Sequence, residues 1–265
     1  MRIDVFLVEK GFCNSRNKAK DLLLKGGVKL NGVVVCKSSV SVNDKDVVEV
    51  EENAIMPYVS KGGLKLEKAI VSFNLDFKNK TVLDIGASTG GFTDCALKHG
   101  AKFVWAVDVG SAQLVQELKE DKRVSSLENT DFRELNLETI GNTVDIIVGD
   151  LSFISLKHIV KHTPQFLTPD GYIVLLIKPQ FEVGVKNIDK GGIVKSPKVH
   201  LVAINEIVDD ARSNGLFLSK LTSVPIVDEK KNIEYLALFK KQPSDYIDVN
   251  EVVRLAFIEK LNFGR

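Results

Sequence analysis

The segment that decides the fold is TVLDIGASTGGFT, residues 81–93. Its first six residues have the apolar pattern of a buried strand, and the glycine-containing turn that follows opens a helix. Glycines at the first strand-to-helix turn let a ligand approach the backbone and let the helix N-terminus face that ligand. The spacing is neither Gly-x-Gly-x-x-Gly nor the Gly-Lys-Ser/Thr of a phosphate loop, which weakens both of these nucleotide-binding predictions.

Strand-like and helical segments alternate from residue 61 onward. The strand-like segments are 81–86, 103–109, 144–149, 172–178, 218–225 and 233–239. Helical segments such as 197–213 separate most of them, and this alternation predicts an α/β fold with a mostly parallel, doubly wound, Rossmann-like sheet. Apolar residues at helical spacing over 248–261 predict a terminal helix that docks on the domain.

The first fifty residues have a different pattern and predict a small α/β unit. Asp4 is placed to cap a short helix, and Ser15 is placed to cap a second helix that ends at Gly26-Gly27. Two β-type runs flank Asn31-Gly32, which is a strong hairpin signal, and 46–50 adds a further strand. We therefore expect a small domain over 1–52, a linker over 53–60, a larger domain over 61–245 and a helical tail over 246–265.

Composition and charge exclude several classes of protein. In the 265 residues, 36 Lys and Arg nearly balance 35 Asp and Glu, so no global charge indicates a nucleic-acid or membrane partner. The longest aliphatic run, 173–177, is far shorter than the ~18 residues that a membrane span needs. The N-terminus lacks the hydrophobic stretch of a signal peptide, and Cys13, Cys36 and Cys95 form no disulfide framework. These features predict a cytoplasmic protein with no stable membrane association.

Basic residues gather between positions 16 and 29, where Asp21 is the single acid. Such a run is either a solvated helix face or a phosphate-binding face, since clustered Lys and Arg release counterions from RNA. The unit resembles the S4 RNA-binding domain through residues 15–19, 22–23, 27–32 and Lys37. This resemblance implies RNA contacts at Arg16, Lys18, Lys20, Lys29 and Lys37.

Acidic residues stand at the strand ends of the larger domain. Asp108 follows Gly86 by 22 positions and is placed to accept hydrogen bonds from the hydroxyls of a bound ribose. Asp84 is placed where an acid could face a ligand's positive charge. An acidic pocket around a glycine turn suits a cationic nucleoside such as S-adenosylmethionine better than a pyrophosphate. A turn whose glycines merely pack and a dinucleotide-binding reductase are the alternatives.

Three further polar residues mark strand ends, where ligands bind in open α/β sheets. Asp150 follows 144–149, Lys178 ends the apolar run from Tyr172, and Glu234 opens a late strand. Burial and a neighbouring cation favour the neutral amine of a lysine, so Lys178 is a candidate base or hydroxyl-orienting group. The alternative for Lys178 is an edge residue whose amine reaches solvent.

Four longer motifs of the larger domain are specific for one protein family. Residues 84–92 (DIGASTGGF), 131–133 (DFR), 150–153 (DLSF) and 178–182 (KPQFE) resemble the FtsJ-type ribose 2′-O-methyltransferases. Together with the S4-like unit and residues 60–66 (SKGGLKL), the chain is similar to the TlyA family. That family comprises ribosomal RNA 2′-O-methyltransferases that are often labelled hemolysins.

The resemblance implies a catalytic set and a cofactor. The catalytic set falls on Lys65, Asp150, Lys178 and Glu234, with Lys61 and Lys68 as neighbours that compete with Lys65 for the first role. Asp108 would meet the ribose of S-adenosylmethionine, Asp131 its adenine, and Gly90 and Phe92 its methionine end. The full set of implied cofactor residues is Asp84, Gly86, Ser88, Gly90, Gly91, Phe92, Asp108, Asp131 and Asp150.

The function that the resemblance implies is methylation of a cytidine 2′-hydroxyl of ribosomal RNA within assembled subunits. The large subunit is favoured and the small subunit is the alternative. No metal is needed, and His158 and His162, four residues apart, lack an obvious third ligand. A membrane-active hemolysin and a non-catalytic RNA-binding ribosome factor are the competing functions.

Overall fold

The structure, a computed structural model, describes residues 1–13, 15–51, 56–226, 228 and 230–263. The chain divides into two units, Met1–Pro57 and Tyr58–Arg265. Residues 53–55 of the predicted linker and the last two residues of the predicted tail lie outside the described residues. The predicted boundaries of the linker therefore stay predictions.

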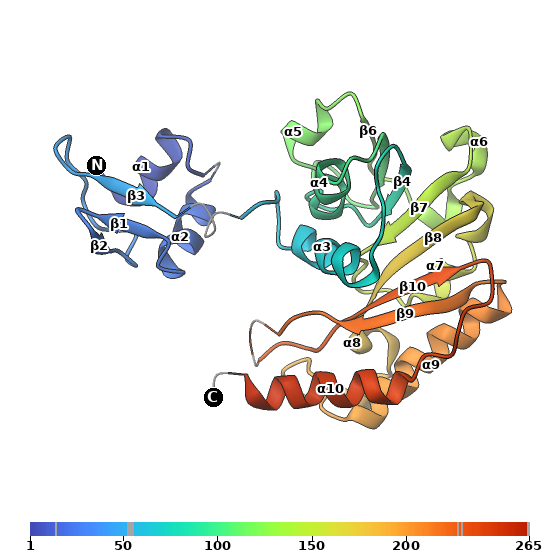
Figure 1. Cartoon of the computed structure of the whole chain (residues 1–265). Coiled ribbons are helices and arrows are strands. Elements are labelled where there is room, and N and C mark those ends of the chain that lie inside the picture. The colour runs from blue at the N-terminus through green and yellow to red at the C-terminus, as the bar shows by residue number, and fades with distance from the viewer. Residues whose placement is uncertain (14, 52–55, 227, 229, 264–265) are drawn as a thin grey trace. The chain divides into compact units, whose positions relative to one another are not determined.

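The N-terminal unit combines two helices with a small antiparallel sheet (Figure 1). The helices are α1 (Ile3–Glu9) and α2 (Arg16–Leu24). The sheet has the strand order β2-β1-β3, with β1 at Val28–Leu30, β2 at Val33–Val34 and β3 at Val48–Val50. Buried apolar side chains from both helices and from β1 form the core of this unit.

The hairpin predicted around Asn31-Gly32 is confirmed. The backbone φ angle is 50° at Asn31 and 79° at Gly32. Two successive residues with positive φ are what a type I′ turn requires, and asparagine and glycine adopt this region most readily. The cap predicted at Ser15 is also confirmed, because its hydroxyl oxygen accepts a hydrogen bond from the backbone N–H of Lys18 at 3.3 Å.

The cap predicted at Asp4 is wrong. Helix α1 begins at Ile3, so Asp4 lies inside the first turn, and its side chain is fully buried. The Asp4 carboxylate pairs with the guanidinium groups of Arg2 and Arg16, each at 2.9 Å. A buried carboxylate needs such partners, because an unpaired charge away from water is costly.

The larger unit is built on a seven-stranded sheet with the order β6-β5-β4-β7-β8-β10-β9 (Figure 1). The strands are β4 (Thr81–Ile85), β5 (Phe103–Val107), β6 (Val124–Leu127), β7 (Val144–Gly149), β8 (Leu167–Ile177), β9 (Phe217–Ser223) and β10 (Tyr235–Lys240). Strand β10 runs antiparallel to both β8 and β9, and the other neighbouring pairs are parallel. The predicted mostly parallel, doubly wound α/β sheet is thus confirmed.

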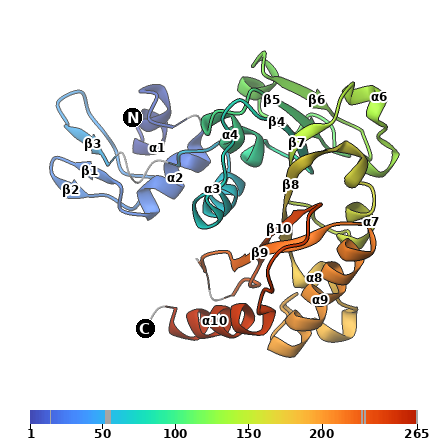
Figure 2. The ribbon, with the colours of Figure 1, turned by 45° about the vertical axis from the view of Figure 1, so that its right-hand side comes forward.

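Helices cover both faces of this sheet, as Figure 2 shows. They are α3 (Gly62–Phe73), α4 (Gly91–Lys98), α5 (Gln116–Lys119), α6 (Leu137–Ile140), α7 (Lys157–Val160), α8 (Pro179–Glu182), α9 (Pro197–Ser213) and α10 (Val249–Asn262). Alternate residues of each strand point to opposite faces. Val82 therefore packs in the core beneath α3 and α4, whereas Leu83 and Ile85 pack in the core beneath α9 and α10.

The observed boundaries differ from the predicted ones in a few places. Strand β4 stops at Ile85 because Gly86 has a φ of 78°, which breaks the extended backbone. Strand β8 begins at Leu167, five residues before the predicted start. Strand β6 was not predicted, since it is a four-residue edge strand that contains two serines and no fully buried residue. Edge strands carry a weaker apolar pattern than central strands.

The strand order reverses at β4, which lies between β5 and β7. Ligands in open α/β sheets bind in the crevice at the carboxyl ends of the strands where this reversal occurs. The carboxyl ends of β4, β5 and β7 are therefore the place to look for a site. Among the described residues, none of the helices is long and apolar enough to span a membrane.

Candidate active site

A cavity of about 520 Å³ opens at the carboxyl ends of β4, β5 and β7. Five of the predicted cofactor residues line it: Gly86, Ser88, Asp108, Asp131 and Asp150. The remaining wall is partly apolar and includes Val107, Phe132, Leu151 and Phe153. A mostly apolar pocket with a few converging polar groups is the usual form of a cofactor site.

The two acids predicted to meet the ribose and the adenine also hold the cavity's own backbone. Asp108 accepts hydrogen bonds from the backbone N–H groups of Ser88 and Gly110, both at 2.7 Å. Asp131 accepts from the backbone N–H of Arg133 and pairs with the Arg133 guanidinium. The hydrogen bond from the Arg133 guanidinium is the main cause that lowers the pKa of Asp131, so that carboxylate stays charged at the cavity wall.

The structure gives packing reasons for two of the glycines. A Cβ atom added at Gly90 would lie 2.3 Å from a Leu118 methyl carbon, and one added at Gly91 would lie 2.3 Å from Ser60 Oγ. Neither glycine lines the cavity among the described residues, and neither does Phe92, whose ring is buried in the core beneath α3 and α4. A side chain at either glycine would thus clash with neighbouring atoms of the protein, and the predicted contacts of Gly90, Gly91 and Phe92 with a cofactor stay predictions.

Asp84 precedes the cavity-lining residues Ile85 and Gly86 in the chain and is fully buried. Its Oδ2 accepts a hydrogen bond from the Thr93 hydroxyl at 2.7 Å, while its buried Oδ1 has no hydrogen-bond partner. Burial raises the pKa of Asp84 to about 7, and the nearby charge of Asp150 adds to the rise. A buried carboxylate oxygen without a partner fits a site that receives a positively charged group.

The four residues of the predicted catalytic set come together at the neighbouring strand ends. Lys178 Nζ lies 2.6 Å from Asp150 Oδ1, and Lys65 Nζ lies 3.3 Å from Asp150 Oδ2. Lys65 Nζ also lies 2.8 Å from Glu234 Oε2. The charges thus alternate along one continuous chain, from Glu234 through Lys65 and Asp150 to Lys178.

Each member of this chain is positioned by a different element. Lys65 projects from α3, Asp150 follows β7, Lys178 is the N-cap residue of α8 after β8, and Glu234 directly precedes β10. Because β10 is antiparallel to β8, its first residue lies at the edge where β8 ends. The single reversed strand therefore brings Glu234 to the edge of the sheet where Asp150 and Lys178 lie.

Three nearby lysines, Lys61, Lys65 and Lys68, are alternatives in the sequence for the first position of the implied catalytic set. In the structure it is Lys65 that contacts Asp150 and Glu234. Burial alone would lower the pKa of the Lys65 amine, but the carboxylates of Asp150 and Glu234 outweigh burial and raise it. Lys65 is therefore a fixed cation beside Asp150 at neutral pH. A raised pKa makes the Lys65 amine poorly suited to accept a proton.

Several residues that the sequence did not single out individually lie beside these four charged residues. The Lys178 amine donates a hydrogen bond to Ser152 Oγ at 2.8 Å and lies 5.7 Å from the centre of the Phe181 ring. Phe181 in turn stacks on Phe153 with a centroid distance of 5.1 Å. Phe153 is 91% exposed and has a φ of 63°. The signal was present, because all three lie within the motifs 150–153 and 178–182.

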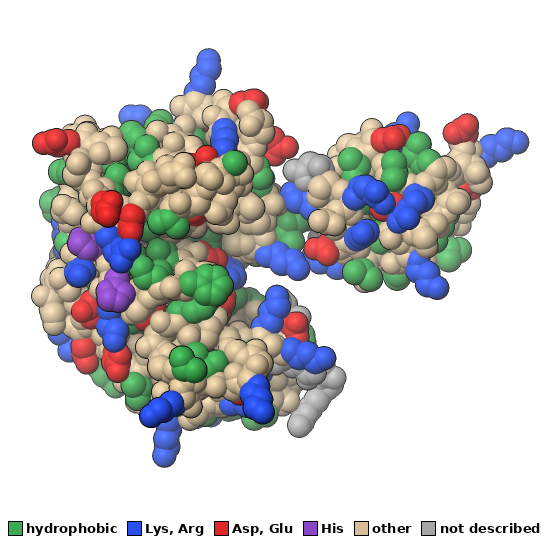
Figure 3. Space-filling view, turned by 180° about the vertical axis from the view of Figure 1, so that it is seen from behind, with side chains coloured by type: hydrophobic (Ala, Val, Ile, Leu, Met, Phe, Trp, Pro, Cys, Tyr) green, Lys and Arg blue, Asp and Glu red, His purple; other side chains and the backbone are tan. Residues whose placement is uncertain are grey.

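The predicted RNA-contact residues lie on the N-terminal unit, where basic side chains gather on one face (Figure 3). Arg16, Lys20 and Lys37 are exposed, and Lys18 and Lys29 are half-buried. Arg16 is tied to the buried Asp4, and Lys29 lies 3.4 Å from Glu51. Arg16 therefore has a structural role in addition to the predicted contact.

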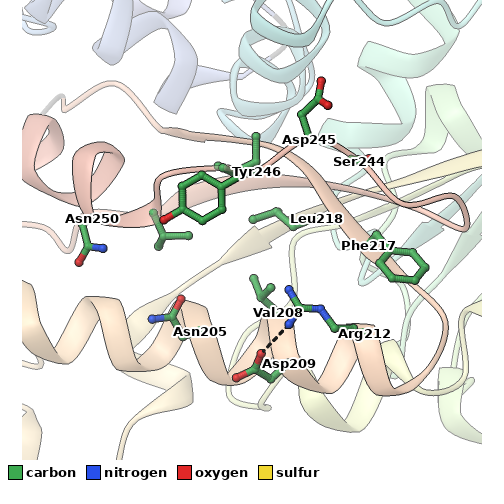
Figure 4. A pocket seen from close by; sticks show the side chains of 12 residues that line it. Asn205, Val208, Asp209, Arg212, Phe217, Leu218, Ser244, Asp245, Tyr246 and Asn250 are labelled. Atoms are coloured by element: carbon green, nitrogen blue, oxygen red, sulfur yellow. Dashed lines mark ion pairs between the residues drawn. The ribbon is translucent and has the colours of Figure 1, made fainter.

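A second cavity, of about 570 Å³, lies between α9, β9 and the segment before α10 (Figure 4). Its floor carries Asp209 and Arg212, paired at 3.6 Å, and the exposed ring of Tyr246 lies at its side. The cavity is at the start of β9 and the end of β10, which is the sheet edge opposite Lys178. It brings together no set of residues resembling an acid–base or nucleophilic centre. The described residues also contain no group of three or more His, Cys, Asp or Glu that could hold a metal ion.

Known proteins match both units of the chain. The FtsJ-like methyltransferase family matches residues 58–241, and the S4 domain family matches residues 1–48. The chain is 43% identical to hemolysin A of Brachyspira hyodysenteriae over 90% of its own length and 99% of that protein. It is 36% identical to the 16S/23S rRNA (cytidine-2′-O)-methyltransferase TlyA of Mycobacterium tuberculosis, over 91% of the chain and 90% of that protein.

The fold matches solved structures as well. A structure described as that of a hemolysin from Streptococcus thermophilus is 36% identical and superposes with a TM-score of 0.75, over 98% of this chain and 96% of that one. The small N-terminal domain and the mixed seven-stranded sheet are the architecture of a class I methyltransferase with an appended S4 domain. This chain belongs to the TlyA family, in which an S4 domain precedes an FtsJ-like methyltransferase domain.

Proposed function

We propose that this protein transfers a methyl group from S-adenosylmethionine to the 2′-hydroxyl of a ribosomal RNA nucleotide, a cytidine within assembled subunits. Membership of a ribosomal RNA methyltransferase family implies the use of S-adenosylmethionine. The observation that carries the proposal is the chain Glu234–Lys65–Asp150–Lys178, which stands beside the cofactor-sized cavity. The large subunit is the favoured target.

The residues of the cavity fit this cofactor. Asp108 would hold the ribose hydroxyls, Asp131 would accept from the adenine, and the buried Oδ1 of Asp84 would offset the positive charge of the methionine end. Ser88, whose N–H is fixed by Asp108, shapes the cavity floor, and Gly86 makes the turn. Gly90 and Gly91 form the start of α4, and Phe92 supports the loop from the core. Bound S-adenosylmethionine supplies an electrophilic methyl group.

Lys178 is placed to hold the attacking hydroxyl. Its amine already donates a hydrogen bond to an alcohol oxygen, that of Ser152, while contacting Asp150. A ribose 2′-oxygen at this amine would be oriented toward the cavity, where S-adenosylmethionine would supply the methyl group. Transfer would leave S-adenosylhomocysteine and release the hydroxyl proton to solvent. Orientation of this kind, together with a positioned acid–base group, typically accelerates a reaction by ~10² to 10⁴-fold or more.

The other three residues hold Lys178 in place. Asp150 bridges the two amines, and Glu234 anchors the Lys65 amine from the far side.

Phe153, exposed at the rim of the cavity, presents an aromatic face on which a nucleotide base can stack. The N-terminal unit would dock the RNA through Arg16, Lys18, Lys20, Lys29 and Lys37 by contacts with phosphates.

The test is transfer of a labelled methyl group from S-adenosylmethionine to purified, unmodified 30S and 50S subunits. The Lys178→Ala protein is run alongside. We expect label in alkali-resistant dinucleotides from the 50S subunit, lost in the variant, because a methylated 2′-oxygen blocks alkaline cleavage of the adjacent bond. Absence of label on both subunits, with cofactor binding intact, would contradict the proposed substrate. Leakage of liposomes exposed to the protein would instead support a membrane-active protein.

A further inference from the structure

Two loops carry the groups that surround the proposed attacking hydroxyl. The loop after β7 contains Asp150, Ser152 and Phe153, and the segment after β8 contains Lys178 and Phe181. The pairing of β7 with β8 places the starts of these loops side by side, but it does not fix the path of either loop beyond the strand ends. The contacts of Lys178 with Asp150 and Ser152 require the separation of the two loops to be held within a few tenths of an ångström.

Glu182, the last residue of α8, joins the two loops. Its Oε2 accepts a hydrogen bond from the Ser155 hydroxyl at 2.6 Å, and its Oε1 accepts from the backbone N–H of Leu156 at 3.0 Å. Both donors belong to the end of the loop after β7. One carboxylate therefore fastens the end of one catalytic loop to the end of the other.

Within the part of the chain that the structure describes, the Glu182 carboxylate forms no ion pair besides these two hydrogen bonds. Burial raises the pKa of Glu182, against the effect of the two hydrogen bonds and of Lys157. The Lys157 amine lies 2.7 Å from the exposed carboxylate of Glu206 on α9. A half-buried carboxylate that accepts two hydrogen bonds from one loop is suited to fixing the position of that loop.

The loop that Glu182 holds is strained. Phe153 has a φ of 63°, a left-handed conformation that is uncommon for a bulky residue. Such a conformation persists only where the surrounding contacts over-determine it. Glu182 fixes the chain two and three residues after Phe153, and the Phe153–Phe181 stack lies between the same two loops.

We propose that Glu182 is a positioning residue, which holds the loop 150–156 against α8 so that Lys178, Asp150 and Ser152 meet in the geometry that orients the ribose hydroxyl. This inference rests on the proposed function. Among the described residues, Glu182 neither lines the cavity nor contacts Lys65, Asp150, Lys178 or Glu234. It therefore acts by holding the loop after β7 against α8.

The test compares four variants in methyl transfer to the subunit that the wild-type protein modifies. In Glu182→Gln the amide oxygen can accept from Leu156 and the amide nitrogen can donate to Ser155 Oγ, so the link between the loops is kept. In Glu182→Ala both bonds are lost, and in Ser155→Ala one is lost. Glu206→Ala is the matched control, because it removes a nearby carboxylate that does not link the loops.

We expect kcat to fall about 10²-fold in Glu182→Ala, since small misplacements of reacting groups have effects of this size. Ser155→Ala should fall by less, and Glu182→Gln and Glu206→Ala should stay within about threefold of wild type, a difference of under ~1 kcal/mol. The dissociation constant of S-adenosylmethionine should be the same in all four. The Leu156 amide, followed by NMR hydrogen exchange, should exchange faster in Glu182→Ala only.

Three results would overturn the inference. One is an unchanged kcat in Glu182→Ala despite faster exchange at Leu156. A second is a loss in Glu182→Gln as large as that in Glu182→Ala. The third is a parallel fall of cofactor affinity and thermal midpoint in Glu182→Ala, as general unfolding would produce. These results are distinct from a failure of the proposed function. In that case the wild-type protein itself would transfer no methyl group to either subunit.

Discussion

The amine of Lys178 and the carboxylate of Asp150 lie 2.6 Å apart, at the carboxyl ends of the neighbouring strands β8 and β7. The same carboxylate contacts Lys65 through its other oxygen. Asp150 therefore links the group proposed to hold the substrate hydroxyl to a fixed cation. Removal of Lys178 should abolish the chemistry while sparing the cavity, because Lys178 does not line that cavity.

Lys178→Ala should lower kcat for ribose methylation by ~10² to 10⁴-fold, the usual contribution of a positioned acid–base or orienting group. The dissociation constant of S-adenosylmethionine, measured by calorimetry, should change by less than about twofold, since under ~0.5 kcal/mol of binding is at stake. Lys122→Ala, which changes an exposed lysine just before β6, is the control. A variant that keeps wild-type kcat would rule out the assigned role.

Asp84 should make cofactor affinity depend on pH. Its pKa in the free protein is raised to about 7 by burial, so between pH 6 and pH 8 the carboxylate becomes ionised and better suited to a cation. Affinity for S-adenosylmethionine should therefore rise with pH through this window in the wild type. The groups of the ligand itself titrate in the same way with the wild type and with Asp84→Asn. A difference between the two pH profiles of affinity therefore comes from Asp84. Identical profiles would show that Asp84 does not sense the ligand's charge.

Asp84 should also affect stability in the absence of ligand. Because its folded pKa is raised above its ordinary value of 3.8, folding takes up a proton between about pH 4 and pH 7. The free energy of unfolding should fall as pH rises through this window, and Asp84→Asn should remove that part of the dependence. Urea denaturation at several pH values measures it. If the free energy of unfolding of Asp84→Asn still falls with pH as steeply as that of the wild type, the dependence comes from other groups.

Asp4 should give stability a pH dependence opposite in sign to that of Asp84. The hydrogen bond from Arg2, aided by Arg16 and opposed by burial, lowers the pKa of Asp4 to about 2. The stability from these pairs is complete above about pH 4 and is lost as pH falls toward 2. The N-terminal unit should show this loss, followed by the amide resonances of α1 and α2, and Asp4→Asn should already lack it at pH 7. Equal acid sensitivity of the variant and wild type would contradict the role of the pairs.

Phe153→Ala should weaken RNA engagement and leave cofactor binding unchanged. Stacking of a base on an aromatic ring is worth ~1–3 kcal/mol, so KM for the ribosomal subunit should rise by about tenfold. Tyr246→Ala is the matched control, because Tyr246 is also an exposed aromatic residue, 85% exposed, but belongs to the opposite sheet edge. A KM effect equal in both variants would argue against stacking at Phe153.

Lys20→Glu should weaken binding to the subunit and reduce its dependence on salt, because phosphate contacts release counterions. The structure makes Lys20 a cleaner probe than Arg16, whose replacement would also leave Asp4 without one of its partners. Binding at several salt concentrations, compared with Lys122→Glu, measures the effect. An unchanged salt slope in Lys20→Glu would contradict the phosphate-binding interpretation of this helix.

The sequence alone predicted the features that depend on neighbours along the chain. The apolar run and turn of residues 81–93 predicted β4 and the start of α4, and Asn31-Gly32 predicted the hairpin. The bounds of α9 matched the prediction, 197–213. The resemblance to the FtsJ-type methyltransferases also implied all four residues of the charged chain. These features could be predicted because backbone preference and apolar periodicity are local properties.

Only the tertiary structure decided which of those residues meet and which do not. It buried Asp4 between two arginines, moved Phe92 into the core and gave Gly90 and Gly91 packing roles. It also showed that Glu182 fastens one catalytic loop to another. The reason is that burial, charge pairing and loop separation arise mostly between segments that are not adjacent in the chain, and only the packing of helices, strands and loops brings those segments together.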